Sequence, residues 1–470
     1  MAKKIGIIGA GPGGYVCAIK AAQLGFDVVL TEKDTVGGTC LNRGCIPTKT
    51  FFKTAELMKD IKRSETFAIF NAGSPKVDGK KLQERKREIV GTLVGGIKQL
   101  LSSYPNLKFY EGFASFEDKK TLKIRLKDGS EIIENDFDNI IIASGSVPKM
   151  TETEGVDLEG VITSDDLLEL EEIPESLIVV GAGVIGLEFA SIYQELGSQV
   201  TLLASRILKG SDKEMQKRLV PTLKKQGVKV YTDIRAKKIT KEGELLRVVA
   251  AYKEKDGEET VEGKYVLIAS GRGPVIEDMG FEKIGIKTDE NGIIVNEKFE
   301  TSVPGIFAIG DVNRIAQLAH VASAQGEWVM DYISGNKPEV NVNVYPSCCF
   351  TMTEVSYTGK TEEELKSEGI SYKVSKFNFA ANGKALSLGE GEGLVKVLTD
   401  DDGKILGIHI IGPHANDLIS EGNFAIANGL SVEDITFAIH AHPTLSEAFL
   451  EASGGIFEKS IHSAPKKKRK

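Results

Sequence analysis

Two cysteines that lie close together in the sequence are the residues best suited to redox chemistry. Cys40 and Cys45 lie in the segment GGTCLNRGCIPTK, residues 37–49, and the whole chain has five cysteines. A regular helix would hold their Cα atoms about 7.5 Å apart, and an extended strand more than about 15 Å apart. A disulfide needs a Cα separation of at most about 6.8 Å. Only a turn or a distorted helix start would therefore let the two thiols meet.

The neighbouring residues favour such a turn and a reactive thiol. Gly37, Gly38 and Gly44 permit the turn, and Pro47 suits the first turn of the helix that is predicted to follow. A helix N-terminus stabilises a thiolate, and Lys49 would add to this effect. We expect an easily exchanged disulfide rather than a buried structural one.

A metal site is the alternative chemistry for close cysteines. Zinc sites need four ligands at characteristic spacings, and no second pair of Cys or His lies near Cys40 and Cys45 in the sequence. We therefore expect no metal. Cys17, Cys348 and Cys349 lie in apolar runs, which predicts that they are small core residues.

The segment HAHPTLSEAF, residues 440–449, offers candidates for the base that thiol–disulfide exchange requires. It contains His440, His442 and Glu447. A histidine that is held by a carboxylate can take up a proton at neutral pH. Glu447 also fits a helix capping box with Thr444. Both roles are compatible, because a carboxylate has several acceptor positions.

Two copies of a glycine fingerprint are the elements that must position these groups. Each copy has an apolar run, then G-x-G-x-x-G, a helical pattern and a second apolar run. Such βαβ units bind the pyrophosphate of a dinucleotide at the helix N-terminus. Two copies predict two dinucleotides, a flavin and a nicotinamide, between which hydride can pass. The glycines are Gly9, Gly11 and Gly14 in the first copy, and Gly181, Gly183 and Gly186 in the second.

The two copies differ where an acidic residue should bind a ribose hydroxyl. Glu32 stands there in the first copy, and Ala204 stands at the same distance from the glycines in the second, followed by Ser205 and Arg206. Without the acid a 2′-phosphate is not repelled, and an arginine can bind it. We predict that the second site favours NADP over NAD. The alternative is that Arg206 points to solvent and NAD still binds.

Composition limits the possible partners. The chain has 470 residues, a net charge of −8 and a sequence pI near 5.6, which argues against nucleic acid. No apolar run of about 18 residues is present, which argues against a membrane span, and the N-terminus shows no targeting pattern. We expect a cytoplasmic protein in a reducing compartment. The final PKKKRK is expected to be a solvated basic tail, and the alternative is a nuclear localisation signal.

The redox segment resembles that of the flavoprotein disulfide reductases, and Leu-Asn-Arg-Gly between the cysteines is most similar to the dihydrolipoyl dehydrogenases. The segments GPGGYVCAIKAAQLG, GAGVIGLEFA, TSVPGIFAIGDV, LAHVASAQGE and HAHPTLSEAF also occur in the order of that family. The resemblance implies an α/β fold with two Rossmann-like dinucleotide-binding domains and a C-terminal α+β dimerisation domain. The implied ranges are 1–149 for FAD binding, 150–271 for NAD(P) binding, 272–340 for a central part that completes the FAD site, 341–462 for dimerisation and 463–470 for the basic tail.

The resemblance also implies roles for single residues. Cys40 would exchange with the substrate, and Cys45 would lie against the flavin. His442, oriented by Glu447, would act as the base on the disulfide of the other subunit, whereas His440 is more often structural. The implied cofactor-binding residues include an ion pair of Lys49 and Glu188, together with Asp311, Ser144, Gly145, Gly271 and Gly310.

The implied enzyme is a homodimer with FAD that oxidises protein-bound dihydrolipoyl groups and passes hydride to NAD(P)+. Its partner would be a lipoylated protein of a 2-oxo acid dehydrogenase complex or of the glycine cleavage system. Glutathione reductase is one alternative, but its motif has Val-Asn-Val-Gly between the cysteines. Mercuric reductase has a C-terminal cysteine pair that this sequence lacks. A non-catalytic flavin-binding scaffold is the third alternative, and the intact thiols and the HPTLSE segment argue against it.

Overall fold

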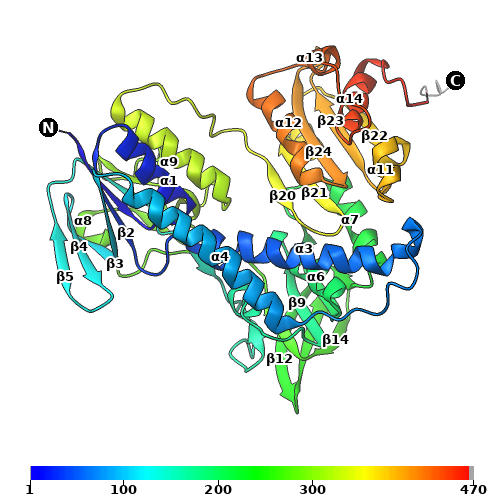
Figure 1. The fold of residues 1–470 in the computed structure, drawn as a ribbon, viewed down its shortest axis with the longest axis horizontal. Helices are drawn as coiled ribbons and strands as arrows, with labels where there is room; N and C mark the ends of the chain where they lie inside the picture. Colours follow the sequence, from blue (N-terminus) through cyan, green and yellow to red (C-terminus); the bar gives the residue numbers. More distant parts are fainter. Residues whose placement is uncertain (1, 465–470) are drawn as a thin grey trace.

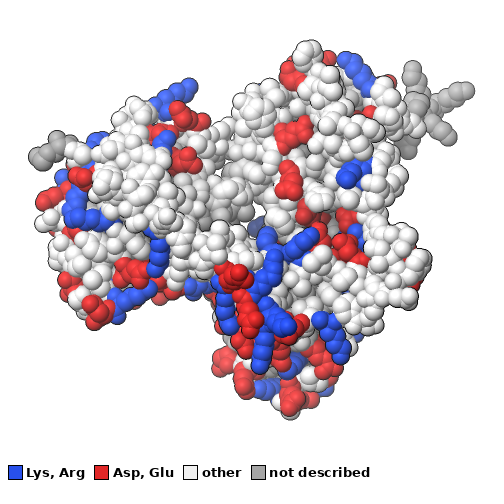
Figure 2. Space-filling model, in the orientation of Figure 1, with Lys and Arg blue, Asp and Glu red and all other residues white. Residues whose placement is uncertain are grey.

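The computed structural model describes residues 2–464, and the segment PKKKRK lies outside the described residues. Three lobes are visible, with helices α3 and α4 crossing between them (Figure 1). Lysine, arginine and acidic side chains are intermixed on the face seen in Figure 2. Within residues 2–464, no helix has both the length and the apolar character that a membrane crossing requires.

The first lobe is built on a seven-stranded sheet in the order β19-β6-β1-β2-β3-β4-β5. The first five strands in this order are parallel, and β3, β4 and β5 are antiparallel neighbours. Helices α1 and α9 pack together over one face (Figure 1), so β1 is buried and reads as a continuous apolar run. The bounds are β1 Lys4–Ile8, α1 Pro12–Gln23, β2 Asp27–Glu32, β3 Leu107–Asp118, β4 Thr121–Leu126, β5 Glu131–Glu134, β6 Asn139–Ile142, α8 Phe281–Ile284, β19 Ile306–Ala308 and α9 Ala319–Ser334.

The second lobe repeats the βαβ arrangement in a five-stranded parallel sheet with the order β11-β10-β9-β15-β8. A separate three-stranded antiparallel sheet, β12-β13-β14, is attached to it. The bounds are β8 Val161–Ile162, α5 Ser164–Leu167, β9 Ser176–Ala182, α6 Val184–Leu196, β10 Gln199–Ile207, α7 Lys213–Lys225, β11 Lys229–Thr232, β12 Ile234–Glu242, β13 Leu245–Tyr252, β14 Glu258–Gly263 and β15 Tyr265–Ile268.

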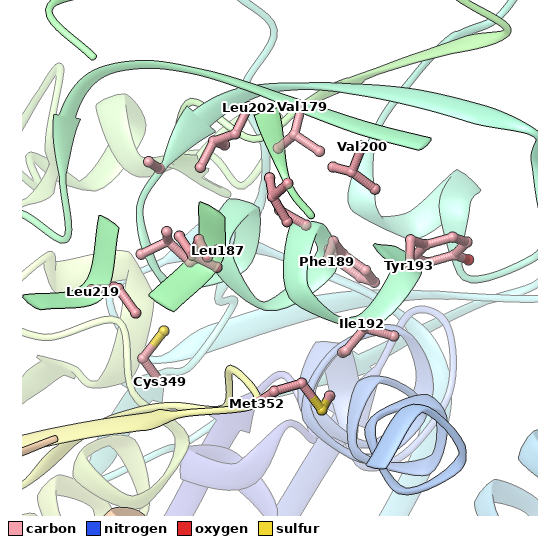
Figure 3. Close-up of a cluster of buried hydrophobic side chains, with 14 of the residues drawn as sticks. Val179, Leu187, Phe189, Ile192, Tyr193, Val200, Leu202, Leu219, Cys349 and Met352 are labelled. Carbon is pink, nitrogen blue, oxygen red and sulfur yellow. The ribbon is translucent and has the colours of Figure 1, made fainter. Parts of the chain in front are cut away.

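The third lobe is an antiparallel sheet, β20-β21-β24-β23-β22, with helices packed on it. Its residues Cys349 and Met352 share a core with helix α6 and strands β9 and β10 of the second lobe (Figure 3). The bounds are β20 Ser347–Cys349, β21 Glu354–Gly359, α10 Glu362–Ser367, β22 Lys373–Asn378, α11 Gly383–Ser387, β23 Leu394–Thr399, β24 Ile405–Gly412, α12 Ala415–Ala427, α13 Val432–Phe437 and α14 Glu447–Gly454. The predicted fold class, two Rossmann-like units and an α+β C-terminal domain, is confirmed.

Connecting elements join the lobes. The helices α2 Gly38–Arg43, α3 Cys45–Lys62 and α4 Gly79–Ser102 follow the first βαβ unit, and α3 packs on α6 of the second lobe. A two-stranded antiparallel ribbon, β7 Ser146–Pro148 with β16 Arg272–Pro274, marks the two points where the chain passes between the lobes. The predicted domain limits at 149/150 and 271/272 lie at the ends of this ribbon.

Candidate active site

The two cysteines lie at a junction between two helices. Cys40 is in α2, and Cys45 is the first residue of α3. At Gly44, between the helices, a Cβ atom would lie 2.9 Å from the carbonyl oxygen of Thr39, so the junction needs glycine. Pro47 lies in the first turn of α3, as predicted. Both thiols are free, and they are near enough to shift each other's pKa, so the junction brings them together.

The two thiols differ in acidity. The hydrogen bond from Cys40, together with the charge of Lys49, outweighs burial and lowers the pKa of Cys45 to about 7. The same hydrogen bond and burial raise the pKa of Cys40. The thiolate is therefore favoured on Cys45 rather than on Cys40.

Lys49 and Glu188 form the ion pair that the sequence resemblance implied. The Lys49 Nζ lies 2.9 and 2.8 Å from the two carboxylate oxygens of Glu188, which projects from α6. The backbone N–H of Phe350 donates to the same carboxylate at 3.0 Å, and the Lys49 Nζ lies 4.1 Å from the centre of the Phe350 ring. Burial opposes the charge of Lys49, but Glu188 outweighs burial and raises the pKa of Lys49. A permanent cation thus stands beside Cys45.

The first glycine loop is a close backbone fit. Gly9 has φ +99°, and a Cβ there would lie 2.4 Å from the carbonyl oxygen of Ala143. A Cβ at Gly14 would lie 1.8 Å from the carbonyl oxygen of Gly9. Gly11 precedes α1 and lies against Gly38 of α2, so the loop and the helix that carries Cys40 are neighbours.

The second glycine loop has the same geometry. Gly181 has φ +111°, and its Cβ would lie 2.4 Å from the carbonyl oxygen of Ala269; a Cβ at Gly186 would lie 2.0 Å from the carbonyl oxygen of Gly181. At Gly183, apart from its neighbours along the chain, no atom of the described residues lies within 4 Å of the Cβ position, which leaves room for a ligand. Each loop thus presents a helix N-terminus, of α1 or of α6, in the geometry that binds a pyrophosphate.

The strand ends beside the two loops differ in charge. Thr31 pairs with Ile8 in the first unit, as Leu203 pairs with Val180 in the second, so Glu32 and Ala204 occupy matching positions. Their immediate surroundings are unlike.

Glu32 is buried and accepts hydrogen bonds from the backbone N–H groups of Ala10 (2.7 Å) and Asp34 (2.9 Å). Burial raises the pKa of Glu32, against the opposing effect of the Ala10 hydrogen bond. The carboxylate thus binds the glycine loop directly, and a ribose hydroxyl at this strand end would meet an acceptor.

Ala204 is buried, Ser205 is half-buried and Arg206 is exposed. The chain then returns to the glycine loop, because Ile207 pairs with Ala182 and the Leu208 N–H donates to the Ala182 carbonyl at 2.8 Å. In the first unit the Gly37 N–H makes the matching hydrogen bond to the Ala10 carbonyl. Gly37 lies five residues after Glu32, whereas Leu208 lies four residues after Ala204. A shorter segment without a carboxylate therefore borders the second loop.

A polar chain links the predicted FAD residue Asp311 to the thiol region. The Ser146 hydroxyl donates to Asp311 at 2.5 Å, and Arg272 donates to the Ser146 hydroxyl at 2.8 Å and its carbonyl at 2.7 Å. Arg272 also reaches the Thr39 hydroxyl at 3.4 Å, next to Cys40. Sequence reasoning missed Ser146 and Arg272, because no spacing rule singles them out.

The remaining predicted cofactor residues lie in the same region as Asp311. The Ser144 hydroxyl donates to the Val275 carbonyl at 2.7 Å, and the Gly310 N–H donates to Gln325 at 2.8 Å. Gly145 and Gly271 have φ values of +74° and +140°. These positions, the first glycine loop and Glu32 together fit an extended dinucleotide such as FAD.

His442 and Glu447 form the predicted pair. The His442 Nδ1 lies 2.8 Å from a carboxylate oxygen of Glu447, whose other oxygen accepts from the Thr444 N–H at 2.9 Å. The bond from Thr444, with that of His442, lowers the pKa of Glu447. His440 instead contacts Glu421 at 2.9 Å, and its side chain is 7% exposed, against 78% for His442. Of the two histidines, His442 is the one accessible to a substrate.

His442 belongs to the connection between helices α13 and α14. The α13–α14 connection is at the outer end of the C-terminal lobe, away from helix α3 (Figure 1). Two large apolar side chains beside it, Phe437 and Ile439, are 91% and 100% exposed. Fully exposed apolar side chains of this size mark an interaction surface, so His442 stands on a face that fits a second subunit.

Across residues 2–464, no group of three or more His, Cys, Asp and Glu side chains is arranged to hold an ion.

Comparisons with known proteins agree with this geometry. Residues 3–326 match the family described as pyridine nucleotide-disulphide oxidoreductase, and residues 345–453 match its dimerisation domain, which implies a homodimer. A dihydrolipoyl dehydrogenase from Geobacillus stearothermophilus is 40% identical over 97% of this chain and 96% of its own length. Mitochondrial dihydrolipoyl dehydrogenase 2 from Arabidopsis thaliana is 38% identical over 97% of this chain and 90% of its own length.

Two solved structures are also similar. LpdA from Mycobacterium tuberculosis has a TM-score of 0.88 and 26% identity, with 96% of this chain and 99% of that chain covered. The HOCl-induced flavoprotein disulfide reductase RclA from Escherichia coli has a TM-score of 0.84 and 26% identity, with 96% and 99% covered.

Proposed function

Because this chain belongs to the pyridine nucleotide-disulphide oxidoreductase family, an FAD-dependent enzyme family, we propose that it oxidises protein-bound dihydrolipoyl groups. The observation that carries the proposal is the Cys40–Cys45 pair at the α2–α3 junction, with Leu-Asn-Arg-Gly between the cysteines. Identities of 38% and 40% to dihydrolipoyl dehydrogenases support it.

The reaction begins with a thiolate of the dihydrolipoyl group, which attacks the Cys40 sulfur of the Cys40–Cys45 disulfide. The sulfur–sulfur bond breaks, a mixed disulfide forms at Cys40, and Cys45 leaves as a thiolate. The second substrate thiol then attacks its own mixed disulfide and releases the lipoyl product and the Cys40 thiolate. The low pKa of Cys45 makes it the better leaving group.

Protons released by the substrate thiols need an acceptor. His442 of the partner subunit fills this role, with Glu447 orienting its ring and stabilising the imidazolium. FAD, when bound at the first glycine loop, would take up the electron pair and deliver hydride to the nicotinamide nucleotide.

We also propose that the acceptor is NADP rather than NAD. The support is the neutral strand end in the second unit, where Ala204 replaces the carboxylate that Glu32 provides in the first. The exposed Arg206 is free to turn toward a 2′-phosphate and bind it through a charge-assisted contact. A kcat/KM for NAD tenfold above that for NADP, equal to about 1.4 kcal/mol, would overturn this part of the proposal.

The expected substrate is a lipoylated protein of a 2-oxo acid dehydrogenase complex or of the glycine cleavage system, and the expected location is the cytoplasm. The substrate follows from the sequence resemblance. The location follows from the two close cysteines, which suit a reducing compartment.

The experiment is steady-state and single-turnover kinetics with dihydrolipoamide. The protein should reduce NADP+ or NAD+ at the expense of dihydrolipoamide, and Cys45→Ser should abolish this while FAD stays bound. His442→Gln should lose at least about 100-fold in the thiol half-reaction, whereas the matched His440→Gln should lose much less. Turnover with glutathione disulfide and none with dihydrolipoamide would favour another member of the family, such as a glutathione reductase-like enzyme.

A further inference from the structure

A row of polar side chains crosses the C-terminal sheet on the face toward the second nucleotide-binding unit. Lys396 on β23 pairs with Lys376 on β22 and with His409 on β24, and His409 pairs with Tyr357 on β21. Residues directly opposite each other in antiparallel strands share a face. These four residues form a polar row. Its two central members lie inside the molecule, since Lys396 is 1% exposed and His409 is fully buried, whereas Lys376 is exposed at one end and Tyr357 is half-buried at the other.

The polar row contacts the start of helix α7. The Lys396 Nζ lies 2.8 Å from Asp212 and 2.6 Å from Glu362, and the Lys376 Nζ lies 2.5 Å from Glu214. Asp212 has no exposed surface and caps α7, since its other oxygen accepts from the Glu214 N–H at 2.9 Å. Lys396 of the dimerisation domain therefore holds a buried carboxylate of the nucleotide-binding unit.

A buried carboxylate needs this partner. Burial is the largest influence and by itself would raise the pKa of Asp212. The hydrogen bond and charge of Lys396, together with His409 and the Glu214 N–H, outweigh burial and lower this pKa. Without the ammonium group, an uncompensated charge would remain in the interior. The ion pair with Lys396 therefore keeps Asp212 ionised and also holds its side chain in place at 2.8 Å.

Asp212 ends the segment that borders the second glycine loop. The segment starts at Ala204, and its other anchor is the hydrogen bond from the Leu208 N–H to the Ala182 carbonyl. The Ser211 hydroxyl donates to the Leu208 carbonyl at 2.9 Å. A continuous path of contacts therefore runs from Lys396 through Asp212 and Ser211 to the glycine loop.

We propose that Lys396 is a positioning residue for the nicotinamide nucleotide. Its ammonium group anchors Asp212 and so holds residues 204–212 in the conformation that receives the adenosine end of the nucleotide. This inference rests on the proposed function, because it takes the second glycine loop as the nucleotide site. The dimerisation domain would then contribute to nucleotide affinity without touching the ligand.

The test compares nucleotide binding in three variants, one of them the charge-conserving Lys396→Arg, and one control. Lys396→Met removes the anchor, and the double variant Lys396→Met/Asp212→Asn removes both charges while Asn keeps a capping oxygen, so that a folded protein is available. Lys366→Met is the matched control, since Lys366 binds the other oxygen of Glu362 from the exposed side at 2.8 Å. Binding of NADP+ and NAD+ to the oxidised holoenzyme is measured by titration calorimetry.

The double variant should bind both nucleotides at least tenfold more weakly, whereas Lys396→Arg and the Lys366→Met control should stay within twofold of the unmodified protein. FAD content and the rate at which dihydrolipoamide bleaches the flavin, measured without nucleotide, should not change. Unchanged nucleotide dissociation constants in a folded, FAD-loaded double variant would overturn the inference. So would an equal fall in the flavin-bleaching rate, which would indicate general structural damage. An unmodified protein that binds neither nucleotide would instead overturn the proposed function.

Discussion

The two βαβ units of this chain are alike in the backbone and unlike at one strand end. In both units the first glycine of the fingerprint has a positive φ angle, and the last glycine packs on the carbonyl oxygen of the first. A Cβ added at the last glycine would lie 1.8 Å from that oxygen in the first unit and 2.0 Å from it in the second. The first unit ends its second strand with a buried carboxylate, Glu32, and the second with Ala204. The two copies thus share the backbone geometry that suits phosphate binding, and they differ in the side chains to which we attribute the choice of dinucleotide.

The largest expected effect tests the glycine-loop geometry that the two βαβ units share. Gly14→Ala and Gly186→Ala each place a Cβ about 2 Å from a carbonyl oxygen, which forces the loop apart. Gly14→Ala should release FAD, measured as flavin absorbance after gel filtration. Gly186→Ala should retain FAD and lose at least about 100-fold in nucleotide kcat/KM, or about 2.7 kcal/mol. If Gly186→Ala also released FAD, the two loops would not serve separate ligands.

The next largest effect tests the difference between Glu32 and Ala204 at the two strand ends. Ala204→Glu restores the carboxylate of the first unit to the second, where its charge should repel a 2′-phosphate and accept a bond from a ribose hydroxyl. The ratio of kcat/KM for NADP to that for NAD should fall about 100-fold, or about 2.7 kcal/mol. Ala204→Gln is the control of similar size without the charge, and an equal shift in both variants would point to shape rather than charge.

A smaller effect is expected from Glu32→Gln. The amide oxygen can still accept from the Ala10 N–H, but the charge-assisted bond is lost. The dissociation constant of FAD should increase about tenfold, which corresponds to about 1.4 kcal/mol of binding free energy. Flavin fluorescence on dilution measures this constant. Glu32→Ala removes both acceptors and should weaken FAD binding further; equal values for the two variants would mean that only the charge matters.

The smallest effect concerns Arg206, whose side chain is exposed. An exposed ionic contact contributes little, so Arg206→Ala should lower kcat/KM for NADP about fivefold, or about 1 kcal/mol, and leave NAD unchanged. Lys209→Ala, at a second exposed cation of the same segment, is the control. A loss with NAD that equals the loss with NADP would remove Arg206 from the selectivity argument.

The sequence predicted most of this architecture because its signals are local. Glycine spacing, apolar runs and the Cys-x₄-Cys segment each define a structure within a few residues, and the two βαβ units and the helix at Pro47 are present as expected. The short helix α2 was not predicted, because six residues carry little periodicity. Contacts between distant segments could not be predicted. No pattern in the sequence around Asp311 indicates its contact with Ser146, and none around Asp212 indicates its contact with Lys396.

Under the proposed function, the exposed position of His442 would make activity depend on the concentration of the protein. The thiol pair and the α13–α14 connection that carries His442 are on different parts of one chain, so a lone subunit would carry two half-sites and complete neither. Activity per molecule should therefore fall on dilution as subunits separate. Two inactive preparations, one with Cys45→Ser and one with His442→Gln, should recover activity when their subunits are exchanged, because each hybrid pair contains one intact combination.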